Sequence, residues 1–334
     1  MNARLVAAPN WIGDAVLSLP LLRALKRNAP AGRLAVLARP GPASIYRAEG
    51  SADDVLVTSG VVASARAASR GRFDEAWLLP NSFRSAIAPF LARIPERIGF
   101  ATDGRAPLLT HRLAPPPRTS HQLRDYDPLL ASRGIEPDLA PPRLAVPPES
   151  ADAAAFALAR AGLPPNRPLV LLAPGAAFGW TKRWPAERFG RLGRLILERG
   201  LLCAVVIGPR EEPLAEEARV AAGGFLPAVG ADLDPVGVAA LAARARLVVS
   251  NDSGPMHLAA AVGTPVVAIF GPTDPGRTGP SGVPSEVLDR YVFCSPCYLK
   301  ECPYRHECMR EISVEEVLGA VLRLTASATA DSTT

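Results

Sequence analysis

Short runs of Val, Leu, Ala and Ile alternate along the chain with longer amphipathic segments, which is the pattern of a doubly wound parallel sheet. In the first half, apolar runs predict strands at Arg4–Ala8, Leu34–Ala38, Asp54–Val57 and Glu75–Leu79. Between them, apolar positions at helical spacing predict helices at Asp14–Asn28 and Ser82–Arg93. The first half is therefore expected to form an α/β domain on a parallel sheet.

A second series of the same kind begins after Pro164. Its expected strands are Leu169–Ala173, Leu202–Ile207, Leu247–Ser250 and Val266–Phe270. Its expected helices are Pro185–Arg199, Glu211–Ala222, Pro235–Ala243 and Pro255–Val262. Pro-rich stretches at 115–117 and 141–148 lack backbone donors and indicate a connector between the two series. We expect two Rossmann-like domains, at residues 1–160 and 161–325, and a frayed tail at 326–334.

Composition supports a folded, two-domain protein. The 334 residues are 48% hydrophobic and 21% charged, as in ordinary globular proteins. The longest uncharged stretch, Ser253–Thr273, contains His257, three glycines and three prolines, so it does not form a continuous apolar membrane helix. Asn10 and Asp14 interrupt the first apolar run before a signal peptide could form. We therefore expect a cytoplasmic protein.

Charge is unevenly divided along the chain. Residues 1–160 hold 20 Lys and Arg against 14 Asp and Glu, a net charge of +6, whereas residues 161–334 hold 17 against 18, a net charge of −1. A basic first half suits nucleic acid, an anionic membrane surface or an anionic substrate. Its charges are scattered arginines without a basic run, so a solvated surface is the simplest interpretation.

The first strand-to-helix turn, Asn10–Asp14, carries candidate chemistry. Loops after parallel strands emerge at one edge of the sheet, so two such domains are expected to face a central cleft. Gly13 permits close backbone approach, and Asp14 stands at the start of the predicted helix. Asp14 is therefore either a helix cap or a functional carboxylate in that cleft.

Two familiar nucleotide motifs are absent. No G-x-G-x-x-G follows any predicted strand, which disfavours a nicotinamide-dependent oxidoreductase. The segment Gly175–Lys182 is glycine-containing, but its lysine stands three residues beyond the second glycine. That spacing disfavours the P-loop of kinases and NTPases.

Lys182 and Arg183 precede the helix predicted to begin at Pro185. Two cations before a helix N-terminus are misplaced for stability, because the helix dipole favours negative charge there. A bound anion would resolve this conflict. The alternative is a solvated pair on a surface loop.

The turn after the strand at Leu247–Ser250 indicates a phosphate site. Ser253 and Gly254 present backbone amides, and the following Pro255 suits the first turn of a helix. Asp252 is expected to accept hydrogen bonds from sugar hydroxyls or to cap the helix. His257 is either a ligand contact or a satisfied core residue.

Three motifs in this order and spacing, Asn10–Asp14, Pro174–Ala176 with Lys182–Pro185, and Asn251–His257, resemble the ADP-heptose:lipopolysaccharide heptosyltransferases, glycosyltransferase family 9. The similarity runs over nearly the whole chain. The first motif and the cysteine-rich segment Cys294–Arg310 resemble the branch that adds the second heptose. The resemblance implies the GT-B fold, two Rossmann-like domains with the acceptor on the first and the nucleotide sugar on the second.

The resemblance also implies roles for individual residues. Asp14 matches the family's general base, and Lys182 matches the lysine that faces the donor diphosphate. The other residues implied at the donor site or the cleft turn are Gly13, Arg183, Asp252, Ser253, Gly254, Met256 and His257. Ala177 and Phe178 stand where first-heptose enzymes carry threonines, so those contacts do not transfer. Glu211 and Glu212 fall near a family carboxylate that holds ribose or adenine, with a loose alignment.

The function implied is inverting transfer of L-glycero-D-manno-heptose from ADP-heptose to the first heptose of the lipopolysaccharide inner core (Hep-Kdo2-lipid A) of a Gram-negative cell. We expect no cofactor and no catalytic metal, because fixed cations and helix amides can serve the diphosphate. The implied acceptor is an anionic glycolipid, with peripheral contact at the inner membrane, no nucleic acid partner and a monomeric enzyme. Alternatives are a first-heptose transferase, a GT-B transferase with another nucleotide sugar, and a non-enzymatic regulator, which the presence of Asp14 disfavours.

Four cysteines, Cys294, Cys297, Cys302 and Cys308, lie within fifteen residues and enclose His306. Their spacing is close to that of a structural zinc site. Reduced thiols in a compact loop remain the alternative, since a disulfide is disfavoured in the cytosol. The fifth cysteine, Cys203, falls in a predicted strand and is expected to be a buried hydrophobe.

Overall fold

The computed structural model describes residues 3–164 and 167–330. The chain forms two compact units, Met1–Leu144 and Ala145–Thr334. The boundary therefore lies before the expected 160/161, because α7 (Pro148–Arg160) belongs to the second unit. Ala154 and Leu158 of α7 are buried in one hydrophobic cluster with Leu241 of that unit.

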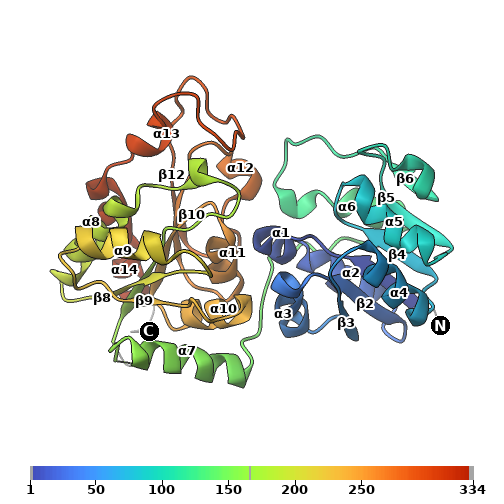
Figure 1. Ribbon diagram of the computed structural model, residues 1–334, viewed down its shortest axis with the longest axis horizontal. Helices are drawn as coiled ribbons and strands as arrows, with labels where there is room; N and C mark the ends of the chain where they lie inside the picture. The colour runs from blue at the N-terminus through green and yellow to red at the C-terminus, as the bar shows by residue number, and fades with distance from the viewer. Residues whose placement is uncertain (1–2, 165–166, 331–334) are drawn as a thin grey trace. The chain divides into compact units, whose positions relative to one another are not determined.

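The first unit contains a six-stranded parallel sheet in the order β3-β2-β1-β4-β5-β6, flanked by helices (Figure 1). Its strands are β1 Ala3–Ala7, β2 Arg33–Ala38, β3 Asp54–Val57, β4 Glu75–Leu78, β5 Glu96–Phe100 and β6 His111–Leu113. Its helices are α1 Ile12–Leu17, α2 Leu19–Asn28, α3 Pro40–Glu49, α4 Val61–Gly71, α5 Phe83–Leu91 and α6 Asp127–Ala131, with short 3₁₀ turns η1 Ala106–Leu108 and η2 Gln122–Arg124. The four strands predicted here are confirmed, and β5 and β6 add two that the sequence pattern did not reveal.

The helix predicted over Asp14–Asn28 is interrupted at Ser18. Pro20 has no backbone N–H to continue the ladder, so α1 ends and α2 begins around this residue. The backbone N–H and the hydroxyl of Ser18 both donate to the carbonyl of Ala15, at 3.2 Å and 2.7 Å, at the end of α1.

The second unit repeats the architecture, with a six-stranded parallel sheet in the order β12-β11-β10-β7-β8-β9. Its strands are β7 Leu169–Ala173, β8 Leu202–Val206, β9 Ala228–Val229, β10 Leu247–Asn251, β11 Val266–Ile269 and β12 Ser285–Leu288. Its helices, besides α7, are η3 Trp180–Lys182, α8 Ala186–Leu197, α9 Glu212–Ala221, α10 Pro235–Ala243, α11 Gly254–Ala261, α12 Pro275–Thr278, α13 Glu307–Arg310 and α14 Val314–Ala330.

The predicted strands and helices of this series are confirmed to within a few residues at each end. The expected frayed tail is partly wrong, because α14 remains helical through Ala330 and so includes residues 326–330; residues 331–334 lie outside the described part of the chain. Val317 and Val321 of α14 are buried in the core of the unit, which holds the helix in place. No helix in the described residues has the length and apolar character needed to cross a membrane.

Each sheet has one point at which the strand order reverses. In the first sheet it lies between β1 and β4, and in the second between β7 and β10. Ligands of open α/β sheets bind at the carboxyl ends of the strands on either side of such a point. The loops after β1, β4, β7 and β10 are therefore the places to look for chemistry.

Candidate functional site

An ion pair joins the two loops at the reversal point of the second sheet. Lys182, at the end of η3, places Nζ 2.5 Å from Oδ2 of Asp252, which directly follows β10. The side chains of Lys182 and Asp252 are 13% and 4% exposed. Lys182 therefore has a partner other than the bound anion expected from the sequence: a carboxylate of the chain itself offsets its charge.

Two neighbouring groups hold this pair in place. Asn251 is fully buried; its side-chain amide donates to the carbonyl of Pro174 at 2.8 Å, and its side-chain oxygen accepts from the backbone N–H of Trp184 at 3.0 Å. Asn251 thus ties the end of β10 to the loop after β7. The Thr273 hydroxyl donates to Oδ2 of Asp252 at 2.7 Å.

Asp252 does not cap α11, which corrects one of the two expectations for it. The N-cap is Ser253, whose side chain makes no capping hydrogen bond and instead lies 3.2 Å from the Ser250 hydroxyl. The first amides of a helix have no intrahelical partner, so α11 presents those of Ser253 and Gly254 beside the ion pair. This arrangement suits an anion.

The other residues predicted in this turn lie deeper. Met256 is fully buried in the hydrophobic cluster that includes Leu241 and Val266. Its side chain therefore packs in the core, and a ligand contact at Met256 stays a prediction. His257 is also buried, in the first turn of α11.

A small cationic and aromatic group surrounds Lys182. The Nζ atoms of Lys182 and Lys300 lie 5.0 Å and 5.5 Å from the centroid of the Phe178 ring. Arg183 donates to the carbonyl of Ala176 at 3.2 Å. The sequence analysis treated Lys182 and Arg183 as one cationic pair, but only Lys182 forms the ion pair with Asp252. The second lysine near Phe178, Lys300, belongs to the cysteine-rich segment.

Glu211 and Glu212 both follow β8 at the same edge of the sheet. The Glu211 carboxylate accepts from the backbone N–H of Gly208 at 2.9 Å. A Cβ atom at Gly175 would stand 2.2 Å from the Glu211 carboxylate, so a larger residue at this position would require the Glu211 side chain to move. Glu212 is exposed at the first position of α9.

The cysteine-rich segment supports the lysine loop. His306 Nε2 lies 2.6 Å from the carbonyl of Thr181, and the Thr181 hydroxyl donates to the carbonyl of Leu299 at 2.7 Å. Burial lowers the pKa of His306, so the imidazole is neutral at pH 7 and Nε2–H donates. The ring also packs edge-on against Trp180, with centroids 4.9 Å apart. Thr181, which precedes Lys182, is therefore held by two hydrogen bonds, one at its backbone carbonyl and one at its hydroxyl.

The cysteines themselves are free thiols. Burial, followed by the neighbouring Cys294, Cys302 and Cys297, raises the pKa of Cys308 to about 11. Burial likewise raises the pKa of Cys203, a fully buried strand residue as predicted. Across residues 3–164 and 167–330, no group of three or more His, Cys, Asp or Glu side chains is arranged to hold a metal ion. The zinc interpretation therefore finds no support in this arrangement.

In the first unit, Asp14 lies in the first turn of α1 but does not cap it. The N-cap is Trp11, and Oδ1 of Asp14 accepts a hydrogen bond from the side-chain amide of Gln122 at 2.8 Å. Burial raises the pKa values of Tyr46 and Tyr126, and the charge of Asp14 raises both further. Asp14 therefore lies near two neutral phenols, and Gln122, which the sequence did not single out, orients its carboxylate.

Comparison with known proteins matches the chain to a family. The model of glycosyltransferase family 9 (heptosyltransferase) matches residues 61–307. Lipooligosaccharide heptosyltransferase 2 of Haemophilus ducreyi is 31% identical over 307 residues, covering 83% of this chain and 85% of that protein. Lipopolysaccharide heptosyltransferase 2 of Escherichia coli K12 is 27% identical over 302 residues, covering 85% and 87%.

A solved structure agrees on the fold. The structure of E. coli ADP-heptose lps heptosyltransferase II matches with a TM-score of 0.84 at 23% identity, over 98% of this chain and all of that one (100%). The predicted GT-B fold, with two Rossmann-like domains, is confirmed.

The buried ion pair predicts a specific loss of stability. Lys182→Met should lower the free energy of unfolding by roughly 3 kcal/mol at neutral pH, because Asp252 stays buried without its cation. Urea unfolding measures the difference between wild type and variant.

Thr273→Val is the matched control, since it removes one hydroxyl and keeps the cation. Its cost should be about 1 kcal/mol. A loss for Lys182→Met no larger than that for Thr273→Val would show that Lys182 does not offset the burial of Asp252.

Proposed function

The chain belongs to glycosyltransferase family 9, the heptosyltransferases, and from that premise we propose that it transfers L-glycero-D-manno-heptose from ADP-heptose to the first heptose of the lipopolysaccharide inner core, Hep-Kdo2-lipid A. It is a glycosyltransferase by family. The substrates follow from relatives named heptosyltransferase 2, which are 27–31% identical over 83–85% of this chain. The observation that carries the proposal is the cationic site at the reversal point of the second sheet.

The donor diphosphate binds at this site. Lys182 supplies a fixed positive charge, and the amides of Ser253 and Gly254 at the start of α11 supply hydrogen-bond donors. Asp252 and Thr273 fix the position of the ammonium group before the donor arrives, so little reorganisation is needed. Glu211, at the neighbouring strand end, accepts hydrogen bonds from hydroxyl groups of the nucleotide ribose.

Asp14 acts as the general base. Its Oδ1 accepts a hydrogen bond from the Gln122 side chain, which orients the carboxylate, and the carboxylate takes the proton of the acceptor hydroxyl. As that O–H bond breaks, the oxygen attacks the anomeric carbon of the heptose, and the bond from this carbon to the diphosphate oxygen breaks on the opposite face. The electron pair leaves with ADP, where Lys182 and the helix amides stabilise the developing charge. The configuration at the anomeric carbon is inverted.

This chemistry requires neither a cofactor nor a catalytic metal. In metal-dependent transferases a metal ion neutralises the diphosphate. Here Lys182 and the N-terminal end of α11 supply the positive charge instead.

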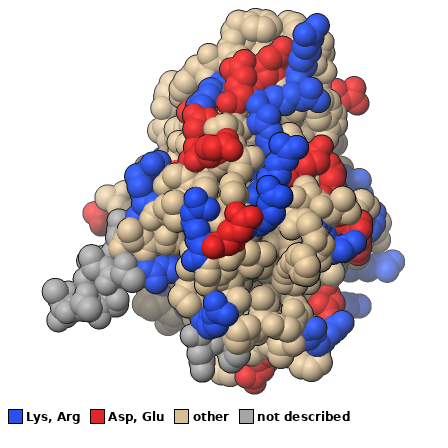
Figure 2. Space-filling view, turned by 90° about the vertical axis from the view of Figure 1, so that its left-hand side faces the viewer, with Lys and Arg blue, Asp and Glu red and all other residues tan. Residues whose placement is uncertain are grey.

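We place the enzyme in the cytoplasm of a Gram-negative cell, as a monomer in peripheral contact with the inner membrane and without a nucleic acid partner. The first half of the chain carries the positive excess of +6, the second half has a net charge of −1, and Figure 2 shows basic and acidic side chains interspersed on the face that it draws. A basic acceptor-binding unit suits an anionic glycolipid in a membrane.

A transfer assay tests the reaction. ADP-heptose with heptosylated Kdo-lipid A should give a product one heptose larger and stoichiometric ADP, at the same rate with and without EDTA. UDP- and GDP-sugars, and Kdo-lipid A without heptose, are the controls. Transfer to the heptose-free acceptor would instead identify a first-heptose transferase, transfer from another nucleotide sugar would change the donor, and a loss in EDTA would contradict the metal-free mechanism.

Asp14→Asn tests the base. It should lower kcat by about 10²–10⁴-fold, because the amide cannot accept the proton, while calorimetry shows ADP affinity within twofold of wild type. Gln122→Ala should lower kcat by roughly tenfold, because the carboxylate remains but loses its orienting partner. Near-wild-type turnover in Asp14→Asn would exclude Asp14 from this role.

Vesicle sedimentation tests the membrane contact. Binding to vesicles that contain the acceptor should fall steeply between low salt and roughly 0.5 M salt, because surface electrostatic attraction is screened over a few ångströms there. Neutral phosphatidylcholine vesicles are the control. Binding that does not respond to salt would contradict electrostatic recruitment.

A further inference from the structure

A cavity of about 110 Å³ lies at the carboxyl edge of the first sheet. The ends of β1 and β2 and the loops after β3 and β4 contribute to its wall. Asn10, in the turn that leads to Asp14, also lines it, so the cavity adjoins the segment that carries the proposed base. Its volume is that of roughly three to four waters, enough for one small oxyanion.

Two arginines line this cavity, and no Asp or Glu does. Arg39 follows β2, and Arg84 lies in the first turn of α5. Both are exposed, and within the part of the chain that the structure describes neither has a carboxylate partner. Their charge is therefore available to a ligand.

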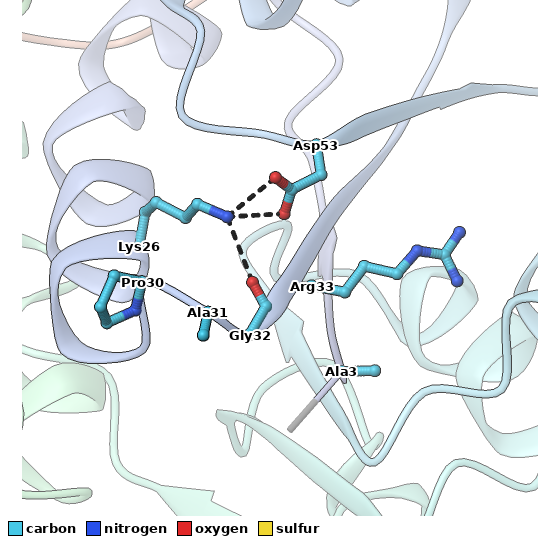
Figure 3. A pocket seen from close by; sticks show the side chains of 7 residues that line it. All are labelled: Ala3, Lys26, Pro30, Ala31, Gly32, Arg33 and Asp53. Atoms are coloured by element: carbon cyan, nitrogen blue, oxygen red, sulfur yellow. Dashed lines mark hydrogen bonds and ion pairs between the residues drawn. The ribbon is translucent and has the colours of Figure 1, made fainter. Parts of the chain in front are cut away.

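A second cavity of the same unit shows the contrast. Figure 3 shows Lys26 pointing to Asp53, with Nζ 2.8 Å from both carboxylate oxygens and 3.2 Å from the carbonyl of Gly32. Arg33, beside it, pairs with Asp54 at 2.8 Å. The cations of that cavity are neutralised by the chain itself, whereas those of the Arg39–Arg84 cavity are not.

A third arginine lies behind the cavity wall. Arg105 is fully buried (0% exposed), and its guanidinium donates to the carbonyls of Phe100 and Pro80 and to the Ser85 hydroxyl. Pro80 and Ser85 line the cavity. Among the described residues no carboxylate pairs with Arg105; burial lowers its pKa, and the more distant charge of Asp103 opposes that shift. A buried positive charge therefore reinforces the field of the two exposed arginines.

Three helix starts add to this field. Arg39, Gly60 and Ser82 are the N-caps of α3, α4 and α5, all three line the cavity, and none makes a side-chain cap bond. None of the three helices has an acidic residue in its first turn. The Phe83 amide of α5 is already taken by Asp103 at 2.6 Å, so the remaining amides and the dipoles are what an anion would meet.

We infer that this cavity is an oxyanion subsite that binds a carboxylate or phosphate group of the acceptor, with Arg39 and Arg84 as its ligands. The inference rests on the proposed transferase function for the identity of the acceptor. Arginine presents paired N–H groups that match the oxygens of either anion. Anchoring the acceptor beside the Asn10–Asp14 turn positions it for proton removal by Asp14.

Acceptor kinetics test the subsite. At saturating ADP-heptose, Arg39→Ala and Arg84→Ala should each raise the acceptor KM about tenfold and leave the KM for ADP-heptose within twofold. Arg84→Lys should recover part of the loss, because it keeps the charge without the fork. Arg112→Ala, an exposed arginine on β6 outside the cavity, is the matched control. An acceptor KM for Arg39→Ala and Arg84→Ala equal to that of the control overturns the proposal.

The source of the anion is resolved by a second acceptor. If the bound group is a phosphate, a dephosphorylated acceptor should bind wild type as weakly as it binds Arg84→Ala. If it is a carboxylate, dephosphorylation should leave the tenfold difference intact. Both results support the subsite and assign its ligand.

A binding experiment separates this inference from the proposed function. Inorganic phosphate and acetate are titrated into the ADP-saturated protein, and the amide NMR signals of Gly60 and Ser82 are followed. Saturable shifts that Arg39→Ala and Arg84→Ala abolish support the subsite, even if wild type transfers no heptose and the proposed function fails. The absence of saturable shifts for both anions in wild type overturns the subsite, whatever the transfer assay gives.

Discussion

The ion pair between Lys182 and Asp252 is the interaction on which the functional part of this structure depends. Parallel pairing of β7 with β10 brings the two loops together at their carboxyl ends, and the Asn251 amide joins them. Burying Asp252 is costly unless a cation and hydrogen-bond donors accompany it, and Lys182 and Thr273 supply both. The fold thus holds a lysine ammonium group beside the start of α11, where a diphosphate can use it.

The cysteine-rich segment supports the loop that carries Lys182. It contributes His306, which holds the backbone next to Lys182, and Lys300, which shares the face of Phe178. This role depends on the buried hydrogen bonds that the segment makes with Thr181. The cysteine spacing suggested a zinc site because it shows which possible ligands are close in the sequence. Whether their side chains can bind one metal ion depends on their positions in space, and among the described residues no such group is found.

Much of the fold was predictable because buried parallel strands leave continuous apolar runs. β3 and β7 were predicted to the residue, and α10 as well. β5 (Glu96–Phe100) and β6 (His111–Leu113) were missed, because charged residues or a glycine separate their few apolar residues and leave no continuous apolar run.

The sequence predicted which loops carry the site residues, but not which side chains pair with one another. Lys182 and Asp252 were each identified, yet their pairing depends on the strand order, which no local pattern encodes. The hydrogen bonds of Thr273 to Asp252 and of Gln122 to Asp14 also join residues that are far apart in the sequence. Only the structure reveals these contacts.

A crystal structure of the protein with ADP tests the central claim most directly. The account predicts diphosphate oxygens about 3 Å from Nζ of Lys182 and from the amides of Ser253 and Gly254, with the chain still anchored by Asn251 on Pro174. ADP bound away from the carboxyl ends of β7 and β10, with Lys182 still engaged only by Asp252, would contradict it.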